Sequence, residues 1–214
     1  MASTPRMKTI FTENEYLTLE RASQERHEYL DGDILLMAGE SPAHATICTN
    51  CGGQLYNQLR RSVCQVWSKD SKVRSGPIPK SSYSTQGLYS FPDLVVVCGD
   101  PQFLDEHLDV LVNPRVIVEV LSPTTEAFDR GEKFLRYRTY LDSLTDYVMV
   151  AQNRPLIEHF ARNETGQWVI AATATDLSQS VELSSIGCTL RLSEVYDRVV
   201  FTGVPEEQLE PANA

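Results

Sequence analysis

The sequence contains little that would place this chain in a membrane or carry it out of the cell. Its apolar runs, among them residues 94–98 and 116–118, fall far short of the ~20 residues that cross a bilayer. The first residues, MASTPRMKTIFTENEY, include no apolar stretch of the length typical of a secretory signal. We therefore expect no membrane partner and a cytoplasmic location.

Positive charge is also scarce. Lys and Arg number 19 against 29 Asp and Glu, which gives a formal net charge of −10. This balance counts against a nucleic-acid binder that relies on a large basic surface. The charges are uneven, however, and two stretches of opposite sign either form two solvated faces or create a local field that attracts a polyanion. The basic stretch contains Arg60, Arg61, Lys69, Lys72, Arg74 and Lys80, and the acidic one Asp100, Asp105, Glu106 and Asp109.

The five cysteines form an odd set, and without an export signal they predict no disulfide framework. Cys48 and Cys51 make a C-x-x-C motif, but a zinc site would need a second pair of ligands. The motif also lies within a predicted helix, whereas a thioredoxin-like site follows a strand. We therefore expect these two cysteines to pack in the core or on the surface. The alternative, a thiol-based redox or zinc protein, would depend on these two cysteines alone. His44, one turn earlier, is expected to be part of the first turn of this helix. The alternative is that its side chain faces the functional site.

The length and the 42% hydrophobic content predict one domain over residues 1–204, followed by an acidic flexible tail at 205–214. Thr12 and Glu15 form a capping box before a helix at residues 13–22, and Asp31-Gly32 predicts a hairpin. Ser41-Pro42 begins a helix that ends near Arg61. Further strands are expected at residues 63–73, 94–98, 115–121, 147–151, 156–161, 167–173 and 188–190, and further helices at 125–140 and from 193. This order predicts an α/β (α+β) fold with a central mixed β-sheet flanked by helices.

Two carboxylates stand out against apolar surroundings. Glu119 is the only polar residue of the strand at residues 116–121, and burial of an ionised carboxylate costs several kcal/mol unless a metal or a basic side chain pairs with it. Asp93 follows Pro92 at the start of another apolar strand. If these strands are antiparallel neighbours, Asp93 and Glu119 meet at one end of the sheet and form a hard oxygen site for Mg²⁺ or Mn²⁺. The alternatives to metal binding are that Asp93 is an ordinary turn residue and that Glu119 is the solvated last residue of a strand.

The pattern Pro92-Asp93…Glu119 resembles the PD-(D/E)xK nuclease core, in which the acids hold the metal and a lysine two positions later aids the attacking water. Here Leu121 occupies that position, and the candidate for a displaced lysine is Lys133. An ordered set of segments also resembles the Uma-two family of restriction-endonuclease-domain proteins, from about residue 12 to 190. The segments are Glu28-Tyr29-Leu30-Asp31-Gly32, Ser41-Pro42 with His44, Phe91-Pro92-Asp93-Leu94-Val95-Val96, Val118-Glu119-Val120-Leu121-Ser122-Pro123, and Asp129-Arg130-Gly131 through Tyr137.

This resemblance implies a restriction-endonuclease-like core, with Asp93 and Glu119 as metal ligands, Lys133 as the catalytic lysine and Glu28 as a further acidic site residue. It also implies a homodimer. The expected function is a Mg²⁺- or Mn²⁺-dependent endonuclease that hydrolyses phosphodiester bonds in DNA. The alternative is a weak or inactive nuclease-fold module that binds nucleic acid or another partner. Lys133 could instead be a solvated cation paired with Asp129, and Glu28 an exposed strand residue.

Overall fold

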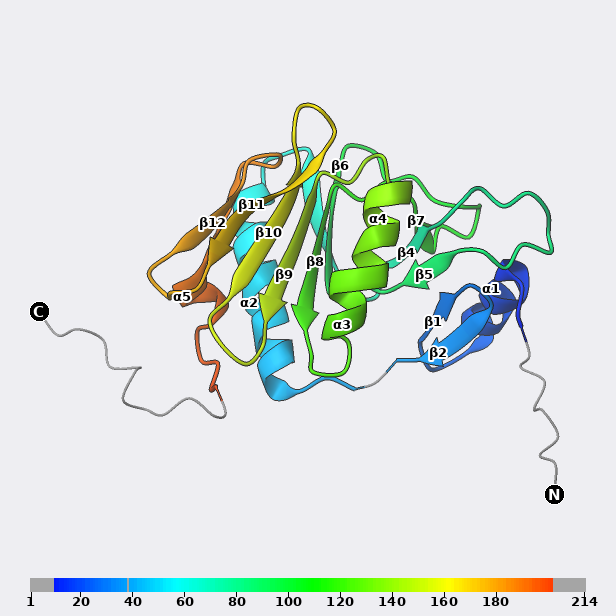
Figure 1. The fold of residues 1–214 in the computed structure, drawn as a ribbon, viewed down its shortest axis with the longest axis horizontal. Helices are drawn as coiled ribbons and strands as arrows, with labels where there is room; N and C mark the ends of the chain where they lie inside the picture. The colour runs from blue at the N-terminus through cyan, green and yellow to red at the C-terminus, as the bar shows by residue number, and fades with distance from the viewer. Residues whose placement is uncertain (1–9, 38, 202–214) are drawn as a thin grey trace, which may run out of the picture.

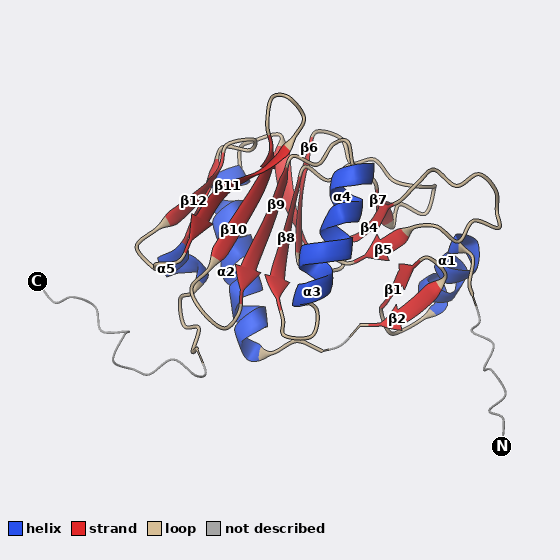
Figure 2. Ribbon diagram, in the orientation of Figure 1, coloured by secondary structure: helices blue, strands red, loops and turns tan. Residues whose placement is uncertain are grey.

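The computed structural model of the chain describes residues 10–37 and 39–201. The tail expected at residues 205–214 lies outside this part, and the extent of the domain stays a prediction. Helices flank mixed β-sheets within these ranges (Figure 2), so the fold is the mixed α/β architecture that the sequence predicts. Among the described residues, no helix has both the length and the apolar character to cross a membrane.

A six-stranded sheet forms the centre of the molecule. Its strand order is β11-β10-β9-β8-β6-β3. Strands β8 and β9 are parallel, and every other neighbouring pair is antiparallel. The strands are β3 (Cys64–Ser68), β6 (Leu94–Cys98), β8 (Val116–Leu121), β9 (Asp146–Ala151), β10 (Ile157–Arg162) and β11 (Trp168–Ala174).

A five-stranded sheet of order β2-β1-β5-β4-β7 and a two-stranded hairpin complete the strands. The five strands are β1 (His27–Leu30), β2 (Asp33–Leu36), β4 (Lys72–Ser75), β5 (Leu88–Ser90) and β7 (Val110–Leu111), and the hairpin consists of β12 (Ser180–Leu183) and β13 (Cys188–Arg191). The helical segments are α1 (Glu13–Ala22), α2 (Pro42–Leu59), α3 (Glu126–Phe128), a π-helical turn (Asp129–Lys133), α4 (Phe134–Tyr140) and α5 (Leu192–Val195).

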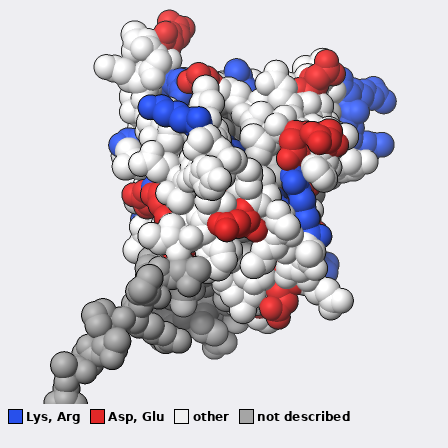
Figure 3. Space-filling view, turned by 90° about the vertical axis from the view of Figure 1, so that its right-hand side faces the viewer, with Lys and Arg blue, Asp and Glu red and all other residues white. Residues whose placement is uncertain are grey.

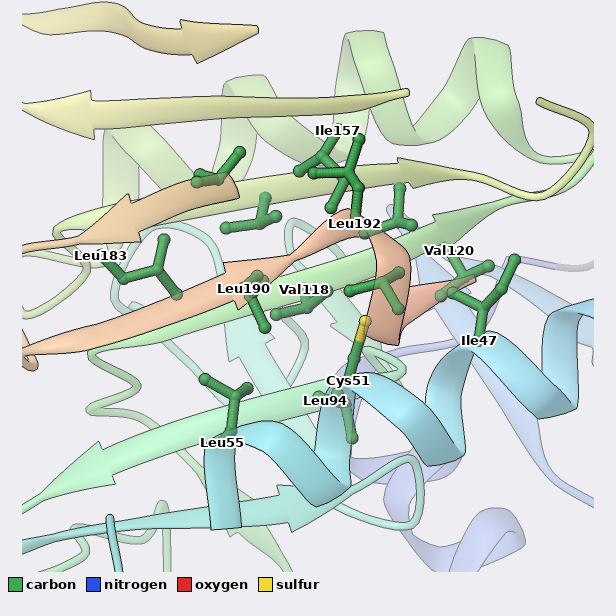
Figure 4. Packing of buried hydrophobic residues seen from close by; sticks show 14 of the residues in the cluster. Ile47, Cys51, Leu55, Leu94, Val118, Val120, Ile157, Leu183, Leu190 and Leu192 are labelled. Atoms are coloured by element: carbon green, nitrogen blue, oxygen red, sulfur yellow. The ribbon is translucent and has the colours of Figure 1, made fainter. Parts of the chain in front are cut away.

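The six-stranded sheet lies between two helical layers, with α2 on one face and α3 and α4 on the other (Figure 1). The apolar side of α2 presents Ile47, Cys51 and Leu55 to Val118 and to the hairpin β12–β13, and all of these side chains are buried (Figure 4). Full burial of an aliphatic side chain of this size contributes about 1.5–3 kcal/mol. Cys51 is fully buried in this cluster, which confirms the packing role predicted for it.

Local sequence signals determine where the first elements begin and turn. The Thr12 hydroxyl accepts the amide hydrogen of Glu15 at 3.2 Å, and the Glu15 carboxylate accepts that of Thr12 at 2.7 Å, as the capping box predicts. Asp31 and Gly32 form the β1–β2 turn with φ of 46° and 97°. A Cβ atom at Gly32 would lie 2.4 Å from Cγ2 of Ile10, so glycine is needed there for space as well as for conformation.

The prediction of a single strand at residues 63–73 is wrong, because this segment forms two strands, β3 and β4. The chain turns at Ser68–Ser71, where the Ser71 amide donates to the Ser68 carbonyl at 3.1 Å, and β3 and β4 then enter different sheets. The strands β5, β7 and β12 were not predicted, because two to four residues do not establish an alternating pattern. The helix expected at residues 125–140 is present, but Asp129–Lys133 is a π-helical turn.

The expectation of no disulfide is also wrong. Cys64 of β3 lies opposite Cys98 of β6 in the antiparallel register, and the two form a disulfide. Cys48, Cys51 and Cys188 are free.

Candidate active site

Strands β6 and β8 bring the two predicted carboxylates to one end of the central sheet. Leu94 pairs with Val118, and one further step of this antiparallel register sets Asp93 opposite Glu119. Oδ2 of Asp93 accepts a hydrogen bond of 2.7 Å from the backbone amide of Val120. Asp93 is therefore tied to the strand that carries Glu119, at the end of β8 nearest to α3 (Figure 1).

Glu119 lies on the face of the sheet that α4 covers. Its neighbours Ile117 and Leu121 pack in the same cluster as Phe134 and Tyr137, and its side chain is only 4% exposed. The Tyr137 hydroxyl lies 3.4 Å from Oε1 of Glu119. The apolar strand thus buries this carboxylate as the sequence predicts, and a solvated strand end is excluded.

Lys133 reaches Glu119 from the π-helical turn. Its Nζ lies 3.1 Å from Oε1 of Glu119, 3.1 Å from Oδ1 of Asp129 and 3.4 Å from Oε1 of Glu28. The pair with Asp129 was predicted, but Lys133 is buried rather than solvated. A π-helical turn places its side chains differently from an α-helix and is frequent at functional sites. Here both Asp129 and Lys133 are buried within it.

Glu28 extends from β1 of the smaller sheet into the same cluster. Its side chain is 16% exposed, so it is not the exposed strand residue of the alternative interpretation. Its Oε1 also accepts the backbone amide of Phe91 at 3.3 Å, two residues before Asp93. The cluster therefore joins both sheets to the π-helical turn.

Burial and mutual repulsion shape the electrostatics of this cluster. Burial, together with the neighbouring carboxylates Asp129, Asp93 and Glu28, raises the pKa of Glu119 well above its ordinary value, although Lys133 opposes this. Burial alone lowers the pKa of an ammonium group, but the carboxylates around Lys133 outweigh it and raise that pKa well above the ordinary value. Lys133 therefore stays protonated.

The donor chemistry fits a divalent metal ion. Three carboxylates, of Glu28, Glu119 and Asp129, lie within 3.4 Å of the Lys133 ammonium, whereas the Asp93 carboxylate contacts the Val120 amide and His44 of α2. Burial is the largest cause of the raised pKa of Glu119, and the neighbouring carboxylates add to it. Carboxylate oxygens are the ligands that Mg²⁺ and Mn²⁺ prefer, so a bound divalent ion would stabilise the ionised form of Glu119.

His44 adjoins the cluster from α2, on the other side of Asp93. Its amide donates to the Ser41 cap at 3.1 Å, and its Nε2 lies 3.3 Å from Oδ2 of Asp93. Burial lowers the pKa of His44, but Asp93 and Glu40 outweigh this effect and raise it. His44 therefore both begins the helix and faces the site.

Two polar residues near Glu119 were missed in the sequence. The Tyr137 hydroxyl, which contacts Glu119, also lies 2.7 Å from the hydroxyl of Ser90 on β5. Tyr137 follows Lys133 by one helical turn, so the i,i+4 spacing could have indicated it. No comparable signal marks Ser90, since β5 itself was not predicted.

The mixed six-stranded sheet between two helical layers defines a protein of the restriction-endonuclease-like fold. A crystal structure from Anabaena variabilis, described as "a putative nuclease belonging to DUF820", matches with a TM-score of 0.68 and 13% identity, over 89% of this chain and 99% of that one. The sequence then places the chain more narrowly. It belongs to the Uma2 family, described as "Putative restriction endonuclease", whose model matches residues 13–193.

Two relatives in Synechocystis sp. are uncharacterized proteins. Protein slr1290 is 34% identical over 187 residues, covering 87% of this chain and 92% of that protein. Protein sll1609 is 29% identical over 161 residues, covering 75% and 86%. The family match over residues 13–193 agrees with the resemblance drawn from the sequence motifs.

Proposed function

We propose that this chain is a divalent-metal-dependent endonuclease that hydrolyses phosphodiester bonds in DNA, with Mg²⁺ or Mn²⁺ held by Asp93 and Glu119. The observation that carries the proposal is the buried ammonium of Lys133, 3.1 Å from Glu119 and 3.4 Å from Glu28. Glu119 lies on β8 and Asp93 directly precedes its neighbour β6, and an ammonium held beside such acids can stabilise the charge that develops on a phosphate. Family membership and the fold support a nuclease role.

Each residue has a distinct task in this proposal. A bound divalent ion supplies an activated water and stabilises charge on the phosphate. Asp93 is held in position by the amide of Val120, which fixes one ligand before any ion binds. Lys133 remains an ammonium, and so it orients the attacking water or offsets the charge that develops on the phosphate. Glu28 adds a third carboxylate that can accept a hydrogen bond from that water.

The charge distribution indicates how DNA would be held. Three members of the basic stretch form ion pairs: Lys69 pairs with Glu40, Lys72 lies 3.6 Å from Asp109, and Arg74 lies 2.8 Å from Glu13. On the face in Figure 3, basic and acidic side chains are interspersed. We therefore propose that contact between metal and phosphate contributes more to DNA binding than a basic surface does. Three cations of that stretch remain exposed, namely Arg60, Arg61 and Lys80.

Plasmid nicking tests this function. The wild-type chain should convert supercoiled plasmid to open-circular or linear DNA with Mg²⁺ or Mn²⁺ and lose this activity with a chelator. Asp93→Ala, Glu119→Gln and Lys133→Met should each reduce the rate at least a hundredfold. Glu164→Gln, which changes an exposed loop carboxylate, should cut as the wild type does. Equal cutting by wild type and Asp93→Ala would identify a contaminating nuclease and refute the proposal.

The second candidate is a nuclease-fold module that binds nucleic acid or another partner without cutting. Two features favour it: the net charge of −10, and Leu121 at the position where the nuclease core has its lysine. DNA binding without metal-dependent cleavage would support this alternative. The homodimer implied by the family resemblance is likewise a proposal, and sedimentation equilibrium would test it.

A further inference from the structure

A second cluster of potential metal ligands lies on the α2 side of Asp93. Within the described part of the chain, one group of at least three His, Cys, Asp or Glu residues has ligand atoms that all lie within 4.8 Å of one another, and it consists of His44, Cys48 and Asp93. His44 and Cys48 are one turn apart on α2, so both project from the same side of that helix. Asp93 reaches them from the start of β6.

The spacing of these atoms suits a tetrahedral ion. Sγ of Cys48 lies 3.5 Å from Nδ1 of His44, and Oδ2 of Asp93 lies 3.3 Å from its Nε2. A zinc ion with bonds of about 2.0–2.1 Å to nitrogen and about 2.3 Å to sulfur sets its ligand atoms roughly 3.3–3.6 Å apart. These two contacts use opposite nitrogens of the imidazole ring, and with one nitrogen as the donor the three ligand atoms lie within 4.8 Å of one another, so a bound ion would draw the third ligand inward.

The donor types distinguish this cluster from the carboxylates around Glu119. A thiolate, an imidazole and one carboxylate together favour Zn²⁺ or Co²⁺, whereas Mg²⁺ prefers oxygen alone. Glu40 adds an outer carboxylate, because its Oε2 lies 3.8 Å from Nδ1 of His44. Such a carboxylate can orient a metal-bound imidazole through the second ring nitrogen.

We propose that His44, Cys48 and Asp93 form a separate site for a borderline transition-metal ion such as Zn²⁺, with a fourth position open to water. This site is not the C-x-x-C site considered from the sequence, since Cys51 is buried in the apolar core. It does not depend on nuclease activity. Because it includes Asp93, an ion bound there would compete with the proposed Mg²⁺ site for that carboxylate.

Cobalt spectroscopy tests the site directly. The full chain, freed of metal with a chelator and then dialysed, is titrated with Co²⁺ in excess Mg²⁺. One equivalent should produce a near-ultraviolet sulfur-to-cobalt charge-transfer band and the visible bands of tetrahedral Co²⁺, and Zn²⁺ should abolish both. If no charge-transfer band appears, the proposed site does not exist.

Two alanine variants on one helix locate the sulfur ligand. Cys48→Ala should lose the charge-transfer band, whereas Cys51→Ala, the matched control, should retain it. His44→Gln should weaken Co²⁺ binding at least tenfold, and it gives an independent result if circular dichroism shows that Cys48→Ala is misfolded. A band that persists in Cys48→Ala, or unchanged affinity in His44→Gln, would overturn the assignment.

A variant of the other cluster separates this proposal from the nuclease proposal. Glu119→Gln should leave the cobalt spectrum and affinity unchanged, although it should abolish DNA cleavage. If the wild-type chain never cuts DNA but shows the expected cobalt spectrum, the zinc-site proposal stands and the nuclease proposal is refuted. Loss of the spectrum in Glu119→Gln would instead refute the separate site.

Discussion

The ammonium of Lys133 lies 3.1 Å from Oε1 of Glu119, and both side chains are buried. A buried ion pair adds little net stability, because its attraction is offset by the desolvation of two charges, but loss of one partner leaves an unpaired charge. In this chain the pair also lies among further carboxylates. The balance between Lys133 and those acids therefore controls how strongly the cluster attracts a cation.

Removal of the Lys133 charge should increase metal affinity while it abolishes catalysis. Lys133→Met leaves the carboxylates of Glu28, Glu119 and Asp129 without their shared ammonium, and so a divalent ion should replace it. We expect Mn²⁺ to bind more tightly than to the wild type and to raise the melting temperature more. Calorimetry and thermal unfolding with and without Mn²⁺ measure both effects. Weaker Mn²⁺ binding in Lys133→Met would argue that the lysine supports the site by structure alone.

DNA binding should depend more on metal than on salt. Lys72 and Arg74 are already engaged with Asp109 and Glu13, so few phosphates can be neutralised by free cations. The slope of log affinity against log salt should therefore be shallow, because it scales with the number of phosphates that cations contact. Fluorescence anisotropy with Ca²⁺ in place of Mg²⁺ measures binding without cleavage. A slope that corresponds to six or more phosphate contacts would contradict this account.

Because of Asp146, the free energy of unfolding should depend on pH in the acid range. Burial raises the pKa of this carboxyl, but hydrogen bonds from His159, Ser185 and Thr145 outweigh burial and lower it. A lowered pKa in the folded state means that the stabilisation is present above the unfolded value of about 3.9 and is lost as the pH falls through the folded value.

Asp146→Asn should accordingly lower the free energy of unfolding by about 1–3 kcal/mol near neutral pH. The difference from wild type should narrow as the pH falls below about 4. Urea unfolding over this pH range measures the effect, with Glu164→Gln, which changes an exposed turn carboxylate, as the control. A difference that stays constant with pH would show that the loss at Asp146 is steric.

The Cys64–Cys98 disulfide should be detectable by counting thiols. The unfolded, unreduced chain should react with three equivalents of a thiol reagent, from Cys48, Cys51 and Cys188, and with five after reduction. The bridge spans 34 positions of sequence, and closure of a loop of that size stabilises by about 3–4 kcal/mol in the chain-entropy model. Reductant should therefore lower the melting temperature of the wild type but not of the Cys64→Ala/Cys98→Ala double variant. Five reactive thiols before reduction would contradict the bridge.

The proximity of Asp93 and Glu119 was predictable because it requires only two apolar strands and an antiparallel register. The contact between Glu28 and Lys133 was expected only from the family resemblance. It depends on how the smaller sheet packs beside the central one and on a π-helical turn, and neither leaves a periodic signal in the sequence. The disulfide was missed for a similar reason, since the number of cysteines does not show that Cys64 lies opposite Cys98.

The central claim is that Glu119 helps to hold a divalent metal ion, and a calorimetric titration of Mn²⁺ into wild type and Glu119→Gln tests it most directly. The side chains of Glu and Gln have nearly the same shape, so the comparison isolates the carboxylate charge. We expect saturable binding to the wild type and affinity at least tenfold weaker in Glu119→Gln, while Glu164→Gln binds as the wild type does. Equal Mn²⁺ affinity in wild type and Glu119→Gln would contradict the account.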